Sequence, residues 1–561
     1  MTGGQFSILH SPLSILNYLY SSMRGKLFLL SFASAALLTV AWPPYGFAPI
    51  LFVALIPLLQ IQHIISNDNR LRARHLFFYA YLTFLLWNLC TTWWVWNASG
   101  GGATLAITAN ALIMAIVFLI YHKVKRNLPE RIGAFVFIPI WISFEFLHLD
   151  WDLSWPWLTL GNGLAKNYTW LQWYEYTGVF GGTLWVLIIN VILFELYIHR
   201  NTLLRHTLIR NIFIGAALLI FLVPIIISLF IYHHYDRKEN ATKPINVVVV
   251  QPNIDPYKKF NGNYKDQLEN FIALAQTKVD SNTDYLVFPE TALTESIWDD
   301  AYKSNWSVMR LHQFIDQFPK LKLVTGATTG REYKSGEEHS PTARFDSIDN
   351  VYYEVYNTAL QFDATPNVQQ YHKSKLVPGV EKMPFPKYLH FLEKLAINMG
   401  GASGSLGVQD TRTVFVSAND QTKIAPVICY ESIYGDYVSE YVRNGADYIF
   451  IITNDGWWGD TPGYKQHLMY GRLRAIETRK SIARSANTGI SCFIDQRGDT
   501  YDEQPWWTGS SIKMTLTSTA GETFYTRHGD YIARAMLWVS IAAACAAVYR
   551  SFRKKKATGA N

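Results

Sequence analysis

The chain has 561 residues, of which half are apolar, 15% are aromatic and only 17% are charged. Soluble domains carry nearer a quarter of charged residues, so length and composition exclude a single ordinary soluble domain. The net charge of +7 comes from basic residues in short scattered clusters, which argues against a nucleic-acid partner.

The first 235 residues are dominated by long apolar stretches, each near the ~20 residues that cross ~30 Å of hydrocarbon. We predict seven membrane-spanning helices there and an eighth near the end of the chain. They lie at 26–42, 47–65, 75–96, 103–122, 133–148, 179–198, 210–233 and 530–549. The first is expected to be retained, because it lacks a clear signal-peptide cleavage site and another span follows at once.

The loops between these predicted spans alternate in charge. Lysine and arginine gather before the first span, after the even-numbered spans and after the last one. The basic loop residues are Arg24, Lys26, Arg70, Arg72, Arg74, Lys123, Lys125, Arg126, Arg131, Arg200, Arg205, Arg210, Arg553, Lys554, Lys555 and Lys556. Positive loops stay on the cytoplasmic side. The pattern therefore predicts cytoplasmic termini and an outward-facing polar domain between the last two spans.

The polar region between spans seven and eight alternates strand and helix patterns. "INVVVVQ" (245–251) is a continuous apolar run typical of a buried strand, and 264–280 has helical spacing. Further strand patterns are "DYLVFPE", "LKLVTGA", "YNTALQFD", "KIAPVICYE" and "DYIFIITND", with helical patterns at 433–444 and 464–484. This alternation predicts an α/β layered sandwich.

The predicted organisation thus has three parts. Residues 1–235 hold spans one to seven, 243–527 form the polar domain, and 528–561 hold the last span and a basic tail. The outer loop at 149–178 is unusually aromatic. Such a loop is typical of an interfacial belt, and it also fits the floor of a lipid-handling cavity; both interpretations can hold together.

Three reactive side chains lie at predicted strand ends. Glu290 closes "DYLVFPE", Cys429 closes "KIAPVIC", and Lys373 follows "NTALQFD" and a short turn. Functional groups collect at the carboxyl ends of strands in open α/β folds, and a carboxylate, an amine and a thiol together fit nucleophilic catalysis. In this hypothesis Glu290 takes the thiol proton and Lys373 favours the thiolate. A nearby cation is expected to depress the pKa of Cys429.

Each of these residues also has a plainer interpretation. A lone cysteine after an apolar strand is more often a structural, buried residue, and Glu290, Lys373 and Lys375 are also typical of solvated positions. A disulfide between Cys429 and Cys492 is a further alternative, although Cys492 itself fits a strand interior. The order Glu, Lys, Cys, with each member in a distinctive local sequence, favours the catalytic interpretation.

Four local sequences carry a resemblance to a known family. "VFPETAL", "YHKSKLVPGVEKMP", "VICYES" and "TNDGWWGD" resemble the carbon–nitrogen hydrolase (nitrilase) superfamily. That resemblance implies an αββα sandwich with a Glu–Lys–Cys triad. Eight flanking spans with the domain inserted before the last one are similar to one branch, the apolipoprotein N-acyltransferases, and the resemblance covers nearly the whole chain.

The resemblance implies a role for each matching position. Glu290 is the implied general base, Cys429 the implied nucleophile, and Lys373 the implied oxyanion-stabilising lysine, with Lys375 the weaker candidate. Glu381 is the implied second carboxylate that positions the others.

Tyr430 and Glu431 are the implied supports beside the nucleophile, and the backbone N–H of Tyr430 is a candidate for holding the oxyanion.

Two departures from the family pattern affect local lipid contacts rather than the reaction type. The chain has "LVPGVE" where the family usually has "LVPFGE", and Phe260 stands where a tryptophan is expected. Phe260, Asn454, Trp457 and Trp458 are candidate substrate-contacting residues: the last three form either a turn with core aromatics or a mobile lip over a cavity. His467 is expected to be a packed or surface histidine.

The function implied by the resemblance is the last step of lipoprotein maturation. An acyl group from a membrane phospholipid would pass through a cysteine thioester to the α-amino group of the lipidated N-terminal cysteine of an apolipoprotein. The implied location is the cell inner membrane, with the domain facing the periplasm. No metal or other cofactor is expected, because the sequence has no zinc-ligand spacing or nucleotide-binding fingerprint. A membrane-tethered amidase or nitrilase and a non-catalytic scaffold remain alternatives.

Overall fold

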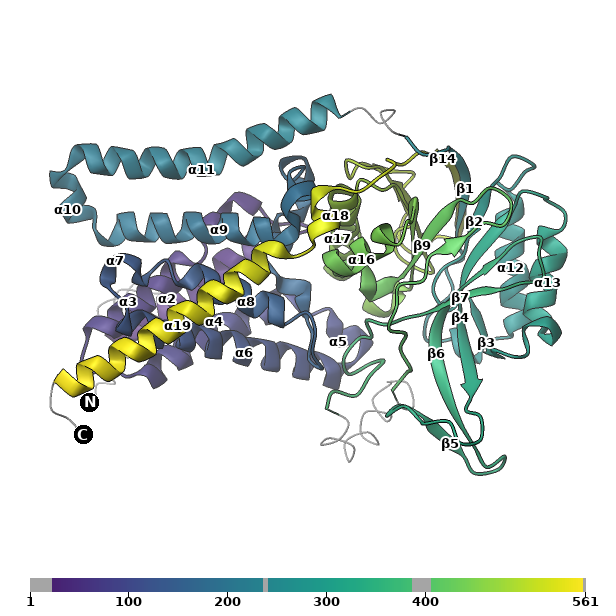
Figure 1. The fold of residues 1–561 in the computed structure, drawn as a ribbon, viewed down its shortest axis with the longest axis horizontal. Helices are drawn as coiled ribbons and strands as arrows, with labels where there is room; N and C mark the ends of the chain where they lie inside the picture. Colours follow the sequence, from purple (N-terminus) through teal and green to yellow (C-terminus); the bar gives the residue numbers. More distant parts are fainter. Residues whose placement is uncertain (1–22, 236–240, 386–404, 558–561) are drawn as a thin grey trace, which may run out of the picture.

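The computed structural model describes residues 23–235, 241–385 and 405–557. A helical bundle and a β-rich domain lie end to end, and the chain returns to the bundle with its last helix (Figure 1). The architecture is a polytopic helical membrane domain joined to an α/β sandwich, as predicted.

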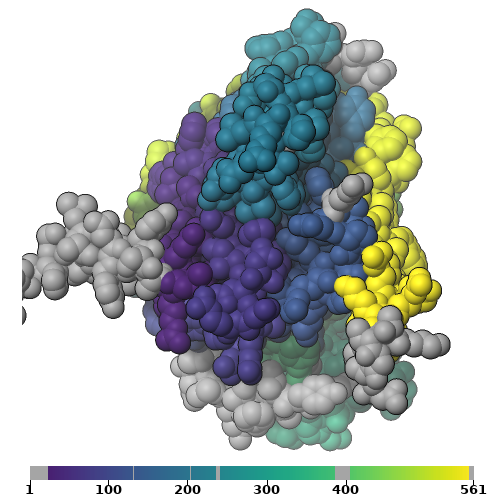
Figure 2. All heavy atoms as spheres, turned by 90° about the vertical axis from the view of Figure 1, so that its left-hand side faces the viewer, coloured from purple at the N-terminus to yellow at the C-terminus, as the bar shows by residue number. Residues whose placement is uncertain are grey.

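The bundle contains every described helix before residue 235 together with the last one. Its helices are α2 (Met23–Ala41), η1 (Ala48–Phe52), α3 (Ile56–Asn67), α4 (Ala73–Thr92), α5 (Val95–Ala98), α6 (Gly100–Asn127), α7 (Glu130–Gly133), α8 (Phe137–Leu147), η2 (Pro156–Leu158), η3 (Leu160–Trp170), α9 (Tyr174–Ile198), α10 (Arg200–Arg205), α11 (Thr207–His234) and α19 (Tyr531–Ala557). In an end-on view α10 and α11 lie along one side of the bundle and α19 along another (Figure 2).

Six helical segments of the described chain are long and apolar enough to cross a membrane. They are Met23–Ala41, Ala48–Asn67, Gly100–Asn127, Tyr174–Ile198, Thr207–His234 and Tyr531–Lys554. Two of the eight predicted spans, 75–96 and 133–148, have no counterpart among these six. The 11 residues of α8 span only about 16 Å, and α4 is long enough but carries polar residues such as Arg74, Asn88 and Thr91, which lower its hydropathy.

Two sheets form the core of the second domain. The eight-stranded sheet has the order β14-β1-β2-β4-β6-β5, with β3 beside β4 and β7 beside β6; the six-stranded sheet has the order β13-β12-β11-β10-β9-β8. The strands of the first sheet are β1 (Ile245–Gln251), β2 (Tyr285–Val287), β3 (Leu293–Trp298), β4 (Lys322–Glu332), β5 (Arg344–Asp346), β6 (Val351–Phe362), β7 (Gln369–His372) and β14 (Ser510–Leu516). Those of the second are β8 (Phe415–Val416), β9 (Lys423–Ile428), β10 (Tyr448–Thr453), β11 (Ile482–Ala486), β12 (Cys492–Ile494) and β13 (Thr500–Tyr501).

The two sheets pack face to face with helices outside each, giving an αββα sandwich (Figure 1). Tyr285 of β2 and Phe450 of β10 meet across the inner faces with ring centroids 5.3 Å apart. Helices α12 (Tyr264–Gln276) and α13 (Trp306–Ile315) cover the first sheet, and α16 (Gly435–Arg443) and α17 (Pro462–Thr478) lie on the side toward the bundle.

Helix α17 is shorter than its predicted range of 464–484. It ends at Thr478 because Arg479 adopts a left-handed conformation, with φ of 52°, and β11 starts at Ile482. Residues 482–484, expected to be helical, are therefore strand.

Helix α17 also joins the sandwich to the bundle. The side-chain amide of Gln466 accepts a hydrogen bond from Trp157 Nε1 at 2.7 Å and donates one to the carbonyl of Pro43 at 2.8 Å. Arg479, just beyond the helix, forms a 2.8 Å ion pair with Glu175 of α9. Trp157 belongs to the aromatic outer loop, so this loop is buried between the two domains and positions the sandwich on the bundle.

Candidate active site

Glu290, Lys373 and Cys429 each lie just beyond the end of a strand. They follow β2, β7 and β9, which belong to different sheets, so the cluster draws on both layers of the sandwich. All three residues are buried, with 6%, 1% and 8% of their surface exposed. The structure thus brings the three residues singled out in the sequence to one end of the sandwich.

The carboxylate of Glu290 accepts three hydrogen bonds. Its Oε1 lies 2.9 Å from Lys373 Nζ and 2.8 Å from Asn357 Nδ2, and its Oε2 accepts the backbone N–H of Asn454 at 3.1 Å. Burial alone would raise the pKa of Glu290, but Lys373 and these donors outweigh it and hold the pKa below its ordinary value. Glu290 is therefore an ionised carboxylate at neutral pH.

Lys373 holds a second carboxylate as well. Its Nζ lies 2.8 Å from Oε1 of Glu381, whose Oε2 accepts the backbone N–H of Val377 at 2.8 Å. Burial lowers the pKa of Lys373, but the charges of Glu290 and Glu381 overcome that effect and keep the pKa well above its ordinary value. Lys373 is therefore a permanent buried cation between two carboxylates.

Cys429 occupies a strained turn. It begins the short helix η7 (Cys429–Ile433) with φ of 49°, in the left-handed region that residues other than glycine seldom adopt. Strain of this kind is held only where the surrounding structure enforces it, and it clusters at functional sites.

The expectation that a nearby cation depresses the pKa of Cys429 is wrong for the protein without a bound substrate. Burial raises the pKa of this thiol well above its ordinary value and Glu290 raises it further, while Lys373 opposes both without overcoming them. The thiol is therefore neutral until a base removes its proton. The alternative of a disulfide is also wrong, since Cys429 and Cys492 are both free thiols.

Glu431 connects the Cys429 turn to the loop that carries Lys373. Its Oε2 accepts the backbone N–H of Ile428 at 2.9 Å, and its Oε1 accepts that of Ser374 at 2.8 Å. The hydroxyl groups of Tyr371 and Tyr437 donate to the same Oε1 at 2.7 and 2.5 Å. Glu431 thereby fixes the residue before Cys429 relative to the residue after Lys373.

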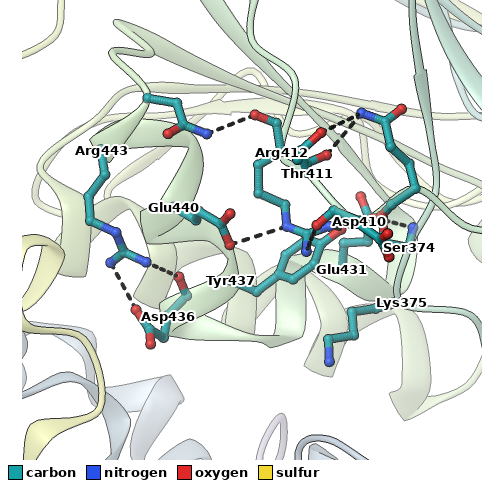
Figure 3. Close-up of polar contacts among 12 residues, drawn as sticks. Ser374, Lys375, Asp410, Thr411, Arg412, Glu431, Asp436, Tyr437, Glu440 and Arg443 are labelled. Carbon is teal, nitrogen blue, oxygen red and sulfur yellow. Dashed lines mark hydrogen bonds and ion pairs between the residues drawn. The ribbon is translucent and has the colours of Figure 1, made fainter.

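Lys375 has a different environment from Lys373. Its Nζ lies 2.8 Å from Asp150 Oδ1 in the outer loop of the bundle and 5.2 Å from the ring centre of Tyr434. In Figure 3 its side chain extends away from Glu431 and Tyr437. Of these two lysines, only Lys373 lies among the buried carboxylates.

Tyr430 connects the Cys429 turn to the bundle. Its hydroxyl donates to the carbonyl of Ser154 at 3.1 Å, and its ring stacks near that of Trp155 with centroids 6.3 Å apart. The outer loop of the bundle therefore reaches the residue next to Cys429.

The four candidate substrate-contacting residues have four different environments. Asn454 is buried and contributes its backbone N–H to Glu290. Trp458 packs on Trp94 of the bundle with centroids 4.8 Å apart, and Trp457 meets Tyr257 edge-on at 5.3 Å. Phe260 lies in η4 (Lys259–Asn261) and is half exposed.

Sequence reasoning missed Asn357, which donates to both Glu290 at 2.8 Å and Glu381 at 3.2 Å. The second half of β6 also contains the polar residues Thr358 and Gln361, so the sequence did not single out Asn357. It also missed Lys259, whose Nζ donates to the carbonyl of Glu290 at 2.9 Å.

A buried ionic cluster packs against the Cys429 turn. His467 lies with Nδ1 2.9 Å from Asp455 Oδ1 and Nε2 3.1 Å from the carbonyl of Cys429, and Arg484 Nη2 lies 2.6 Å from Asp455 Oδ2. Burial would raise the pKa of Asp455, but Arg484 and His467 lower it to about 2. His467 is thus a packed residue, in keeping with its predicted character.

The arrangement suits chemistry on a carbonyl group. It contains a neutral thiol on a strained turn, an ionised carboxylate able to accept its proton and a buried ammonium able to stabilise negative charge.

Comparisons with known proteins match both domains. Residues 34–192 match the family described as the apolipoprotein N-acyltransferase N-terminal domain, and residues 246–523 match the carbon-nitrogen hydrolase family. Proteins named apolipoprotein N-acyltransferase in Chlorobaculum tepidum, Geobacter metallireducens and Haemophilus influenzae are 29%, 26% and 24% identical to the chain. The alignments cover 94%, 96% and 90% of this chain and 98%, 97% and 91% of those relatives.

Solved structures resemble the sandwich domain only distantly. A Saccharomyces cerevisiae member of the nitrilase superfamily has a TM-score of 0.35 at 16% identity, covering 51% of this chain and 94% of its own. An amidase from Nesterenkonia sp. has a TM-score of 0.35 at 13% identity, covering 52% and 95%. The sequence matches carry the assignment: with both domains matched and relatives aligned over nearly its whole length, this protein belongs to the apolipoprotein N-acyltransferase family.

Proposed function

We propose that this protein is an apolipoprotein N-acyltransferase that moves a fatty acyl group from a membrane phospholipid to the α-amino group of a lipidated N-terminal cysteine. Family membership supports the reaction class. The single observation that carries the assignment of the site is the buried cluster in which Lys373 bridges Glu290 and Glu381 beside the strained turn of Cys429.

In the first half of the reaction Glu290 takes the proton of the Cys429 thiol, and the sulfur attacks the ester carbonyl of the phospholipid. Two of the three N–H donors of Lys373 serve the carboxylates, so the third can stabilise the oxyanion together with the backbone N–H of Tyr430. The carbon–oxygen bond then breaks, Glu290 returns the proton to the departing lysophospholipid, and the acyl group remains on sulfur as a thioester.

In the second half the α-amino group of the apolipoprotein attacks the thioester carbonyl. Glu290 accepts a proton from the amine, the carbon–sulfur bond breaks and the proton returns to Cys429, which leaves an amide on the acceptor. The donor product leaves before the acceptor reacts, so the kinetics are ping-pong. In these steps Glu381, Asn357 and Glu431 position the reacting side chains.

The geometry of the bundle supports an orientation in the membrane. Helices α7 and α10 and the end of α19 lie at the end of the bundle away from the sandwich (Figure 1), and α6 ends there with Lys125 and Arg126. Since basic segments favour the cytoplasmic side, we place that end in the cytoplasm and the sandwich in the periplasm of a cell with an inner membrane. In this proposal 1–235 and 528–561 anchor the enzyme, and 243–527 carry catalysis.

Intact-mass measurement after incubation with a phospholipid tests the proposal. The wild type should gain the mass of one acyl chain on Cys429 and lose it when a diacylglyceryl-modified peptide with a free amino terminus is added. Release of ammonia from small amides without an acyl adduct would instead identify an amidase. Absence of both reactions would identify a scaffold.

A further inference from the structure

Lys259 is a buried cation that the proposed reaction does not use. Its side chain is fully buried, and its Nζ lies 2.9 Å from the carbonyl oxygen of Glu290 and 2.9 Å from Oγ1 of Thr291. The neighbouring Lys258 has a side chain that is 85% exposed and reaches only Asp255, at 3.9 Å. Burying an ammonium is costly unless charge or hydrogen bonds compensate it. Because Lys259 is buried while Lys258 is exposed, we expect Lys259 to have a specific role.

The residues that Lys259 holds form a tight turn at the candidate base. Thr291 has φ of 47°, in the left-handed region. A Cβ on Gly326 of β4 would lie 2.4 Å from the backbone nitrogen of Thr291 and 2.6 Å from Cα of Glu290. The Glu290–Thr291 turn therefore packs tightly against β4 on one side. The Lys259 ammonium donates hydrogen bonds to two of its oxygen atoms, the carbonyl of Glu290 and Oγ1 of Thr291.

The charge balance of the cluster also supports a role for Lys259. Glu290 and Glu381 bring two negative charges, and Lys373 brings one positive charge. Burial lowers the pKa of Lys259 to about 7 while Glu290 opposes this, and the charge of Lys259 in turn lowers the pKa of Glu290. A second cation therefore lies within electrostatic reach of the base.

We propose that Lys259 is a positioning residue for the acyl-transfer reaction, which holds the Glu290–Thr291 turn by two hydrogen bonds and supplies the second positive charge that keeps Glu290 ionised. This inference rests on the proposed function of Glu290 as the base. Lys259 touches no reacting atom and acts through Glu290 alone.

Glu290 is faced by polar or charged groups from five elements. They are Lys373 after β7, Asn357 on β6, the backbone of Asn454 after β10, Cys429 after β9, and Lys259 in η4. Removing the Lys259 charge leaves Lys373 as the single cation in this set, so the pKa of Glu290 must rise.

The test compares full-length Lys259→Met with full-length Lys258→Met, its exposed neighbour. The first readout is the rate of acyl-adduct formation on Cys429 with phosphatidylethanolamine, measured by mass spectrometry across pH. The second is the rate of Cys429 alkylation by iodoacetamide across the same pH range, which needs no acyl donor. Thr291→Val serves as a further variant that removes one acceptor of the ammonium but keeps its charge.

Lys259→Met should slow acylation by about 10- to 100-fold. The acid limb, which is the fall in rate at low pH, should move to higher pH in both the acylation and the alkylation profiles. Lys258→Met should match the wild type, and Thr291→Val should slow acylation without moving the acid limb. Unchanged rates and an unmoved acid limb in Lys259→Met would overturn the inference, and so would a lower melting temperature as its only effect. A wild type that forms no acyl adduct would contradict the proposed function instead, while the iodoacetamide profile would still decide the role of Lys259.

Discussion

The ammonium of Lys373 lies 2.9 Å from the carboxylate of Glu290, and both side chains are buried. In the proposed mechanism this pair supplies a base for the thiol and a cation for the oxyanion, the two functions that acyl transfer needs. It also keeps Glu290 charged in an apolar setting where an isolated carboxyl group would be protonated.

Glu290→Gln should cut the rate of acyl-adduct formation at neutral pH by about 10²- to 10⁴-fold, the usual contribution of a general base. Burial and Glu290 both raise the pKa of Cys429, so the variant has a less perturbed thiol but nothing to remove its proton. Its residual rate should therefore rise with pH as the thiolate forms unaided. A variant rate that is independent of pH would argue against Glu290 as the base.

The wild-type rate should stay flat as the pH falls from 7 to about 5. The pKa of Glu290 is held below its ordinary value of 4.5, so the base is lost only when the pH falls through that lower value. The same depressed pKa makes the ionised carboxyl stabilising at neutral pH, a contribution lost only under acid conditions. Single-turnover acylation rates across this range provide the measurement, and a base-like inflection near pH 6 would contradict the assignment.

Lys373→Met and Lys375→Met should differ sharply in their effects. The first removes the cation that Glu290 and Glu381 share and should lower the acylation rate by at least about 10²-fold. The second removes contacts with Asp150 and Leu149 of the outer loop and with the ring of Tyr434, and it should retain most of the rate. Equal losses in the two variants would show that the family pattern had been assigned to the wrong lysine.

Gly326→Ala should damage the site without changing any of the proposed catalytic side chains. The new Cβ would lie 2.4 Å from the nitrogen of Thr291 and 2.6 Å from Cα of Glu290, which are backbone atoms with little freedom to move. We expect a large loss of acylation rate in a protein that still folds. Gly509→Ala is the matched control, because its nearest contact is 3.8 Å away, and it should behave as the wild type.

Asp455→Asn should destabilise the sandwich by about 3–5 kcal/mol, because it leaves the buried Arg484 without its carboxylate partner. The pKa of Asp455 is lowered to about 2, so its stabilising effect is complete above its ordinary pKa and is lost only as the pH falls toward 2. Thermal or denaturant unfolding measures the effect, with exposed Asp502→Asn as the control. A loss below 1 kcal/mol would mean that the cluster behind Cys429 contributes little to stability.

Local sequence patterns predicted most of the fold and the three central residues of the candidate site. The apolar run 245–251 coincides with β1, and Glu290, Lys373 and Cys429 lie at strand ends as expected. These features depend on neighbours in the sequence, which a pattern can report.

Other features depend on contacts between distant segments and were therefore missed. Asn357 and Lys259 take part in the cluster because β6 and η4 pack beside Glu290, and nothing local marks either residue as a partner of a carboxylate. The pKa of Cys429 was expected to fall because a cation is near, but the structure shows that burial has the larger effect. The predicted span 75–96 has no counterpart among the six apolar segments because the polar side chains of α4 lower the average hydropathy of an otherwise apolar helix.

The most direct test of the account is the intact mass of the wild type and of Cys429→Ala after incubation with a phospholipid. The account predicts one added acyl chain on the wild type, located on Cys429 and removed by an acceptor amine, and none on the variant. An equal acyl adduct on Cys429→Ala, or transfer of the acyl group to the acceptor at the wild-type rate by that variant, would contradict it.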